Sequence, residues 1–142
     1  MKARLISVLA VATVASHLHI LAAGIRDDFN DANDDGWTRY QPLAPFGAPG
    51  AFSFPNGGYR IQAGPSPDPN AFGPGRAGSF RTDQVYANFV TTADLLAWDN
   101  NQNQAFGVMG RVNSLGFGTL GGYTLTYSTA GFLNLGDRKS VV

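Results

Sequence analysis

Apolar and polar residues alternate with a period of two along much of the chain. The run Tyr123-Thr124-Leu125-Thr126-Tyr127 alternates over its whole length, and shorter runs at 51–54 and 59–63 flank Pro55-Asn56-Gly57-Gly58. A period of two is typical of a half-buried β-strand, and a short Gly/Asn link between two such runs favours a hairpin. The pattern therefore predicts strands and at least one hairpin.

β-branched and aromatic residues predict further strands at 25–29, 37–40, 77–81, 89–98, 105–112 and 132–135. The run 89–98 is the longest of them. A turn of helix over 94–98 is the alternative there, but Val90, Thr91 and Thr92 are β-branched and favour a strand. Alternation also assigns one set of side chains to an inner face, namely Phe106, Val108, Tyr123, Leu125 and Tyr127.

Prolines and glycines concentrate in residues 41–50 and 64–75, which we predict to be surface loops because proline removes a donor from a strand ladder. Strands that recur without an intervening helix predict an all-β fold, an antiparallel two-sheet jelly-roll sandwich formed by residues 24–136. Residues 137–142 follow without a closing strand. We interpret them as a truncated or foreign tail and the sandwich as incomplete at its C-terminus. A natural short terminal strand is the alternative.

Residues 1–23 have the features of a secretory signal peptide. A basic start precedes the apolar run 5–15, and small residues follow up to Ala23. A membrane anchor is the alternative, but a serine and two histidines interrupt the apolar stretch. The rest of the sequence has no stretch apolar enough to span a bilayer. The sequence therefore predicts a secreted or cell-surface protein with no membrane insertion after cleavage.

Composition narrows the chemistry of the part after position 23. It contains no His, Cys or Glu, because His17 and His19 lie in the predicted signal peptide and all ten acidic residues are Asp. These absences exclude a Ser-His-Asp or Cys-His system and the usual ligand set of zinc. Asp94 and Asp99 are close in the sequence, but on the predicted strand their spacing sends them to opposite faces. We assign no catalytic residue, and the balance favours binding over catalysis.

The charge balance argues against a nucleic-acid partner. Removal of residues 1–23 takes away two of the ten basic residues and none of the ten acidic ones, which leaves a net charge of −2. A nucleic-acid partner needs a clustered basic face.

An Asp-rich loop, Asp31-Ala32-Asn33-Asp34-Asp35-Gly36, matches the first half of a calcium-binding loop. The match then fails, because the twelfth position is Pro42 where such loops carry a bidentate Glu. One interpretation is a looser calcium cage of oxygen ligands from Asp28, Asp31, Asn33 and Asp35. The alternative is an Asx-rich turn whose side chains cap their own backbone.

Aromatic residues beside polar loops are the candidates for carbohydrate contact. An aromatic face stacks on the apolar face of a sugar ring, and Asp and Asn side chains hydrogen-bond its hydroxyls. Trp98 is the strongest candidate because a polar loop follows it at once. Packing in the core or at its rim is the alternative for each aromatic residue. The candidate set is Trp98, Asp99, Asn100, Asn101, Asn103, Trp37 and Tyr40, with Tyr59 as a further aromatic.

The segment Asp27-Asp28-Phe29-Asn30-Asp31…Asp34-Asp35-Gly36-Trp37 resembles the opening of exported bacterial domains of the concanavalin A-like lectin/glucanase superfamily, including laminin-G-like sandwiches. The resemblance extends loosely through 106–111 and 122–123. It implies a two-sheet jelly roll that often binds carbohydrate and sometimes calcium. The glucanase members carry a strand motif with paired Glu, and this chain has no Glu to occupy it.

Three functional hypotheses follow. The first is an exported, non-catalytic β-sandwich that binds a polysaccharide, a cell-surface glycan or another extracellular surface component, with calcium as a candidate cofactor. The second is the N-terminal fragment of a polysaccharide-degrading glycoside hydrolase. The third is a structural or adhesive cell-surface protein.

Overall fold

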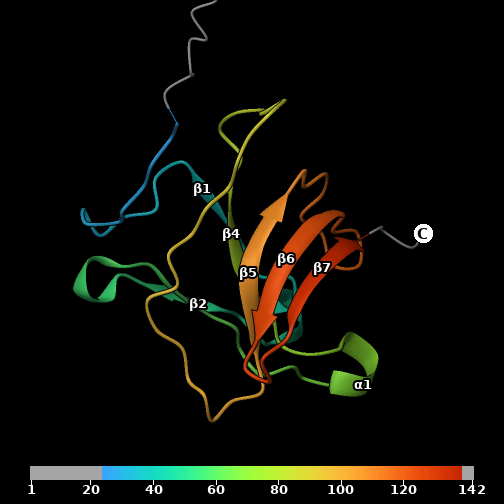
Figure 1. The fold of residues 1–142 in the computed structure, drawn as a ribbon. Helices are drawn as coiled ribbons and strands as arrows, with labels where there is room; N and C mark the ends of the chain where they lie inside the picture. Colours follow the sequence, from blue (N-terminus) through green and yellow to red (C-terminus); the bar gives the residue numbers. More distant parts are fainter. Residues whose placement is uncertain (1–23, 139–142) are drawn as a thin grey trace, which may run out of the picture.

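The computed structural model describes residues 24–138, and Figure 1 shows their arrangement. The predicted signal peptide and residues 139–142 of the predicted tail lie outside this range. Short strands dominate, with little helix. The elements are β1 (Trp37–Tyr40), η1 (Ala44–Phe46), β2 (Ala51–Ser53), η2 (Pro55–Gly57), β3 (Arg60–Gln62), α1 (Pro69–Phe72), β4 (Gly78–Arg81), β5 (Ala105–Gly110), β6 (Gly122–Ser128) and β7 (Leu133–Arg138).

The strands form three antiparallel sheets. β1 pairs with β4, β2 pairs with β3, and β5, β6 and β7 form a three-stranded sheet with β6 in the middle. The predicted hairpin is confirmed, since η2 turns the chain between β2 and β3. The prediction of antiparallel β-structure is confirmed as well. The sheets are small, however, and they do not establish a two-sheet jelly roll.

The prediction of a strand at 25–29 is wrong. Side-chain oxygens of Asp27 and Asp28 accept hydrogen bonds from the backbone N–H groups of Phe29 and Asn30, at 3.0 and 3.2 Å. These Asx turns bend the chain, and Phe29 takes a φ of 55°. Local side-chain capping therefore replaces the strand that the apolar pattern indicated.

The prediction of a strand at 89–98 is also wrong, because this segment has no ladder partner and runs as irregular chain from β4 toward β5. Val90 and Leu96 are exposed, whereas the rings of Phe89 and Trp98 pack on other rings. β-branched residues favour a strand only where a neighbouring strand covers them. The argument that alternation separates Asp94 from Asp99 fails with the strand.

A short helix stands inside the predicted loop 64–75. The side chain of Asp68 accepts hydrogen bonds from the N–H groups of Asn70 and Ala71, and Pro69 occupies the first turn. This cap and proline are a sequence signal for a helix start. Across residues 24–138, no helix is both long and apolar enough to cross a membrane.

The set of side chains predicted to share one face of β5 and β6 does so. Phe106 lies opposite Tyr127, and Val108 lies opposite Leu125. This face is poorly covered, since Tyr123 is 52% exposed, and Leu125 and Tyr127 are exposed as well. The predicted inner face is therefore only partly buried.

The buried hydrophobic residues of the described range are few: Tyr40, Leu43 and Ala48. Leu43 is the only large side chain in this range that is fully buried, with 1% of its surface exposed. The ring of Tyr40 meets that of Phe80 edge-on at 5.8 Å. A second cluster joins Phe46, Phe72 and Phe117, and Arg76 lies over the Phe117 ring.

Candidate functional site

The loop after Trp98 presents an aromatic surface beside polar side chains. The indole lies 5.3 Å from the ring of Phe106, measured between centroids, and Trp98 as a residue is 46% exposed. Its Nε1 donates a hydrogen bond of 2.7 Å to Oδ1 of Asn100. The ring is thus held in one orientation by a packing contact and a hydrogen bond, with part of its surface open to solvent.

Hydrogen bonds within the loop fix its backbone. Oδ1 of Asp99 accepts from the N–H of Asn101 at 2.9 Å, and the carbonyl of Asp99 accepts from the side chain of Gln104 at 2.7 Å. Asn100, Asn101 and Asn103 are all exposed. The structure therefore brings Trp98, Asp99, Asn100, Asn101 and Asn103 together in one exposed loop, as expected from their order in the sequence.

Thr129, in the turn between β6 and β7, holds this loop from the side. Its Oγ1 donates to the carbonyl of Gln102 at 2.9 Å and accepts from the N–H of Gln104 at 3.3 Å. Its own N–H donates to the carbonyl of Gln104 at 3.0 Å. The sequence analysis did not identify Thr129, because a turn threonine carries no signal for a contact made 25 residues away.

Trp37 and Tyr40 belong to other parts of the fold, and their assignment to the carbohydrate set needs correction. Tyr40 is 6% exposed and packs in the core, so its ring has no face to offer a sugar. Trp37 packs against Phe29 at 5.6 Å and lies under the guanidinium of Arg81. These two aromatic residues hold the N-terminal part together.

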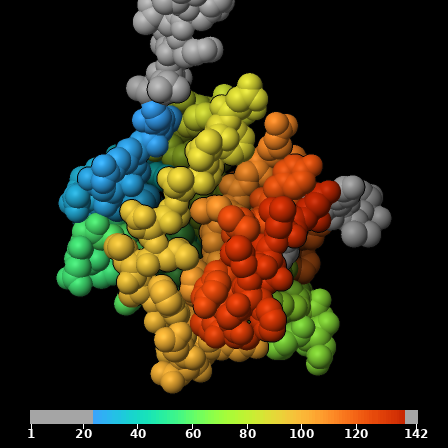
Figure 2. All heavy atoms as spheres, in the orientation of Figure 1, coloured from blue at the N-terminus to red at the C-terminus, as the bar shows by residue number. Residues whose placement is uncertain are grey.

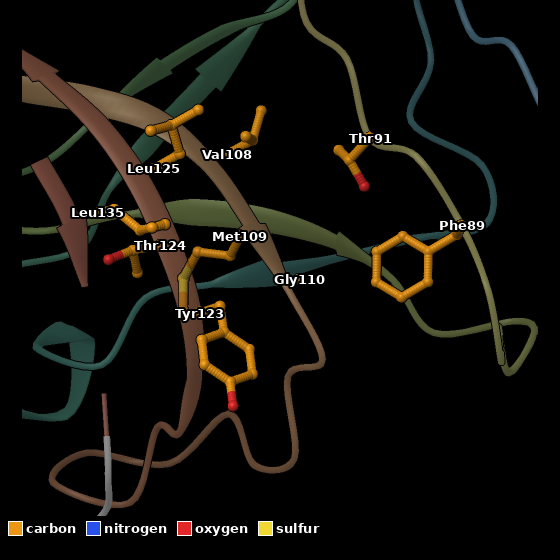
Figure 3. Close-up of a pocket in the computed structure, with 9 residues that line it drawn as sticks. All are labelled: Phe89, Thr91, Val108, Met109, Gly110, Tyr123, Thr124, Leu125 and Leu135. Carbon is orange, nitrogen blue, oxygen red and sulfur yellow. The ribbon is translucent and has the colours of Figure 1, made fainter. Parts of the chain in front are cut away.

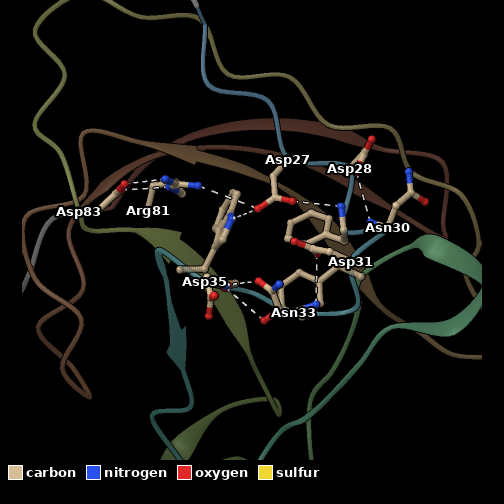
Figure 4. Close-up of polar contacts among 12 residues, drawn as sticks. Asp27, Asp28, Asn30, Asp31, Asn33, Asp35, Arg81 and Asp83 are labelled. Atoms are coloured by element: carbon tan, nitrogen blue, oxygen red, sulfur yellow. Dashed lines mark hydrogen bonds and ion pairs between the residues drawn. The ribbon is translucent and has the colours of Figure 1, made fainter.

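The Asp-rich loop consists of consecutive Asx turns (Figure 4). Oδ1 of Asp28 accepts from the N–H of Asn30, Oδ1 of Asp31 from that of Asn33, and Oδ1 of Asn33 from that of Asp35. The side chains are thus engaged with their own backbone, as the Asx-turn interpretation expects. Within residues 24–138, no group of three or more His, Cys, Asp or Glu is placed to hold a metal ion.

Gly36 closes the loop in a left-handed conformation with a φ of 81°. A Cβ at this position would lie 2.9 Å from a guanidinium nitrogen of Arg81. The left-handed backbone conformation therefore favours glycine here, whereas the flexible end of the Arg81 side chain could move away from an added Cβ.

Asp34 accepts hydrogen bonds from two different side chains in this region. The sequence analysis treated it only as a member of the calcium-binding pattern. Its carboxylate accepts two hydrogen bonds from Arg39 of β1, at 2.6 and 3.0 Å. It also accepts one of 2.6 Å from the hydroxyl of Tyr59, which precedes β3. The Tyr59 hydroxyl lies 3.3 Å from Ser79 of β4. Asp34 therefore links the β1–β4 ladder to the β2–β3 ladder.

These contacts shift two ionisation equilibria. Hydrogen bonds from Arg39 and Tyr59 hold the pKa of Asp34 below its ordinary value of 3.8. Burial, followed by the hydrogen bond to Asp34, raises the pKa of Tyr59 above 10.0. Charged Asp34 and neutral Tyr59 are thus the forms that the fold favours.

We expect the Asp34 contacts to appear as acid sensitivity. A group with a lowered pKa in the folded state stabilises the fold fully above its unfolded pKa, here near 3.8, and loses this contribution as the pH falls through the folded value. Urea denaturation at pH values from neutral to acidic should show the wild type losing stability more steeply in the acid range than Asp34→Asn. Parallel curves for the two proteins would show that the Asp34 contacts do not stabilise the fold.

Asp27 and Asp83 flank Arg81 at the other side of the loop. Oδ2 of Asp27 accepts a hydrogen bond of 2.7 Å from Nε1 of Trp37 and lies 3.9 Å from Arg81. Arg81 also donates two hydrogen bonds to Asp83, which lowers the pKa of that carboxyl. The contacts around Arg81 join the N-terminal loop to the end of β4.

Comparisons of the chain with protein-family profiles, with curated proteins and with solved structures find no match.

Proposed function

We propose that the protein binds carbohydrate on an extracellular surface through Trp98 and the loop 99–104, without catalysing a reaction. The observation that carries the proposal is the half-exposed Trp98 ring, fixed on Phe106 and flanked by exposed Asn side chains. A pre-oriented aromatic face lowers the cost of ordering on binding. Because Oδ1 of Asn100 is occupied by the indole N–H, the Asn100 amide nitrogen is left as a donor to a hydroxyl.

The proposal includes the finer fold and the location inferred from the sequence. In this proposal the small antiparallel sheets belong to a two-sheet jelly roll of the concanavalin A-like kind, and a signal peptide exports the protein. Carbohydrate binding as proposed does not require calcium at the Asp-rich loop. The Asx turns there favour a role of the Asp and Asn side chains in shaping the loop. The hydrolase and adhesive hypotheses are alternative outcomes of the experiment below.

Affinity electrophoresis in gels containing a panel of polysaccharides tests the binding. We expect weak retention that falls about tenfold in affinity in Trp98→Ala, equivalent to about 1.4 kcal/mol of lost binding free energy. Trp98→Phe should retain part of the affinity because a smaller ring still stacks. Tyr86→Ala is the matched control, since Tyr86 is an exposed aromatic residue outside the loop.

Two further arms distinguish the alternatives. Release of reducing sugar that Asp94→Asn or Asp99→Asn abolishes would show an enzyme, and absence of retention on every polysaccharide would favour the adhesive hypothesis. Retention is also measured with calcium and with a chelator. A loss in chelator that Asp35→Ala reproduces would place calcium in the Asp-rich loop.

A further inference from the structure

One face of β6 and β7 is largely apolar and open to solvent. Leu125 lies opposite Leu135, and Tyr127 lies opposite Leu133, so their side chains share this face. Leu135 is 81% exposed and Leu133 is 70% exposed. β7 is the edge strand of its sheet, and Figure 2 shows the atoms of β6 and β7 at the viewed surface. We call this surface the β6–β7 face; its apolar residues are Tyr123, Leu125, Tyr127, Leu133 and Leu135. Asp137 lies opposite Tyr123 at one end of the face, so the carboxylate stands at the rim of the apolar area.

The size of the β6–β7 face exceeds what scattered surface residues provide. Its exposed fractions and ordinary side-chain areas give on the order of 500 Å² of contiguous apolar surface, which is near the upper end for a monomer. Two such faces in contact remove at most about 1,000 Å² from water, which is the lower limit for a specific interface and fits a weak, reversible dimer. The area therefore fits a second copy of the same face.

A groove at the side of this face offers space for a side chain of the second copy. It has a volume of about 150 Å³ and lies between Phe89 and Thr91 on one side and the strand residues Val108, Leu125 and Leu135 on the other (Figure 3). Its lining is largely apolar. An apolar space of roughly this size accepts a group as large as benzene. The protruding residues of β7 provide groups of this kind.

We propose that the β6–β7 face is the interface of a symmetric dimer, in which two three-stranded sheets pack face to face. Both copies contribute the same surface, as a two-fold interface requires. Each sheet covers the Tyr and Leu side chains of the other. Two antiparallel sheets in this arrangement form a sandwich whose second layer comes from the second copy.

Sedimentation velocity over a range of concentrations tests the dimer. We expect a monomer–dimer equilibrium in the wild type that Leu135→Asp weakens at least about tenfold, because an unpaired carboxylate would be buried in the interface. Asn134→Asp is the matched control, since Asn134 is the exposed neighbour on the opposite face of β7. This control should dimerise like the wild type. Leu135 is so exposed that its replacement leaves the fold of the monomer intact, which circular dichroism checks.

Cysteine cross-linking gives an independent reading, because the chain contains no cysteine of its own. Leu125 and Leu135 form the middle row of the face, between the rows of Tyr123 and Tyr127, so a two-fold axis through the centre of the face passes close to Leu135. A Leu135→Cys thiol then lies near its symmetry mate at a high effective concentration and should oxidise to a dimer at least about ten times faster than Asn134→Cys. A wild type that stays monomeric, equal effects of the two aspartate variants, or equal oxidation rates of the two cysteine variants would each overturn the proposal. Assembly without limit would overturn it as well.

Discussion

Replacing Leu43 with alanine is expected to lower the free energy of unfolding by about 2 to 5 kcal/mol, the range for large-to-small changes at buried sites. Leu43 is fully buried, and its carbonyl accepts hydrogen bonds from the N–H groups of Phe46 and Ala48. Domains of this size have about 5 to 15 kcal/mol of stability in total. We therefore expect Leu43→Ala to remove a substantial part of this total, and a protein at the low end of the range would become largely unfolded at 37 °C.

Urea denaturation followed by circular dichroism measures this effect. Leu96→Ala is the matched control, because it deletes the same atoms from a side chain that is 78% exposed. The control should change the free energy of unfolding by less than about 0.5 kcal/mol. Equal losses in the two variants would show that the region around Leu43 is not the core of the folded protein.

The hairpin of β2 and β3 was predictable because its signal is local. Asn56 and Gly57 take positive φ angles of 54° and 73° in the turn between β2 and β3, as such residues do readily. Alternation likewise located β6 and the side chains that it shares with β5. The strand predictions for 25–29 and 89–98 were wrong. The residue types there suit a strand, but no neighbouring strand is available to pair with them.

In the candidate site, too, the local contacts were predictable from the sequence and the long-range contacts were not. The loop from Trp98 to Asn103 is contiguous in sequence, so its residues come together without any knowledge of the fold. The contacts of Thr129 with Gln104 and of Asp34 with Tyr59 span 25 residues each, and no local sequence pattern predicts them. Tyr40 shows the opposite error, because its burial depends on the packing of β4 against it and not on its neighbours in the sequence.

The rings of the protein form separate clusters. Phe29, Trp37, Phe54 and Tyr59 pack together beside the N-terminal loop, whereas Trp98, Phe106 and Tyr127 pack on the three-stranded sheet. Contacts of Phe117 with Phe46 and Phe72 connect the part around β5–β7 to the part around η1 and α1. Cooperative unfolding requires strong coupling between such clusters. The described part of the chain has few buried hydrophobic residues to provide it.

We therefore expect the two clusters to unfold at different urea concentrations, and the two tryptophans allow each to be observed alone. Trp98→Phe leaves Trp37 as a reporter of the N-terminal cluster, and Trp37→Phe leaves Trp98 as a reporter of the three-stranded sheet. Phenylalanine preserves ring packing at both sites. A difference of about 2 kcal/mol in local stability separates the fluorescence midpoints by roughly 1 M urea, given ordinary urea dependences. Circular dichroism of each variant controls for destabilisation by the substitution itself. Coincident midpoints in both variants and by both methods would show a single cooperative unit and contradict this expectation.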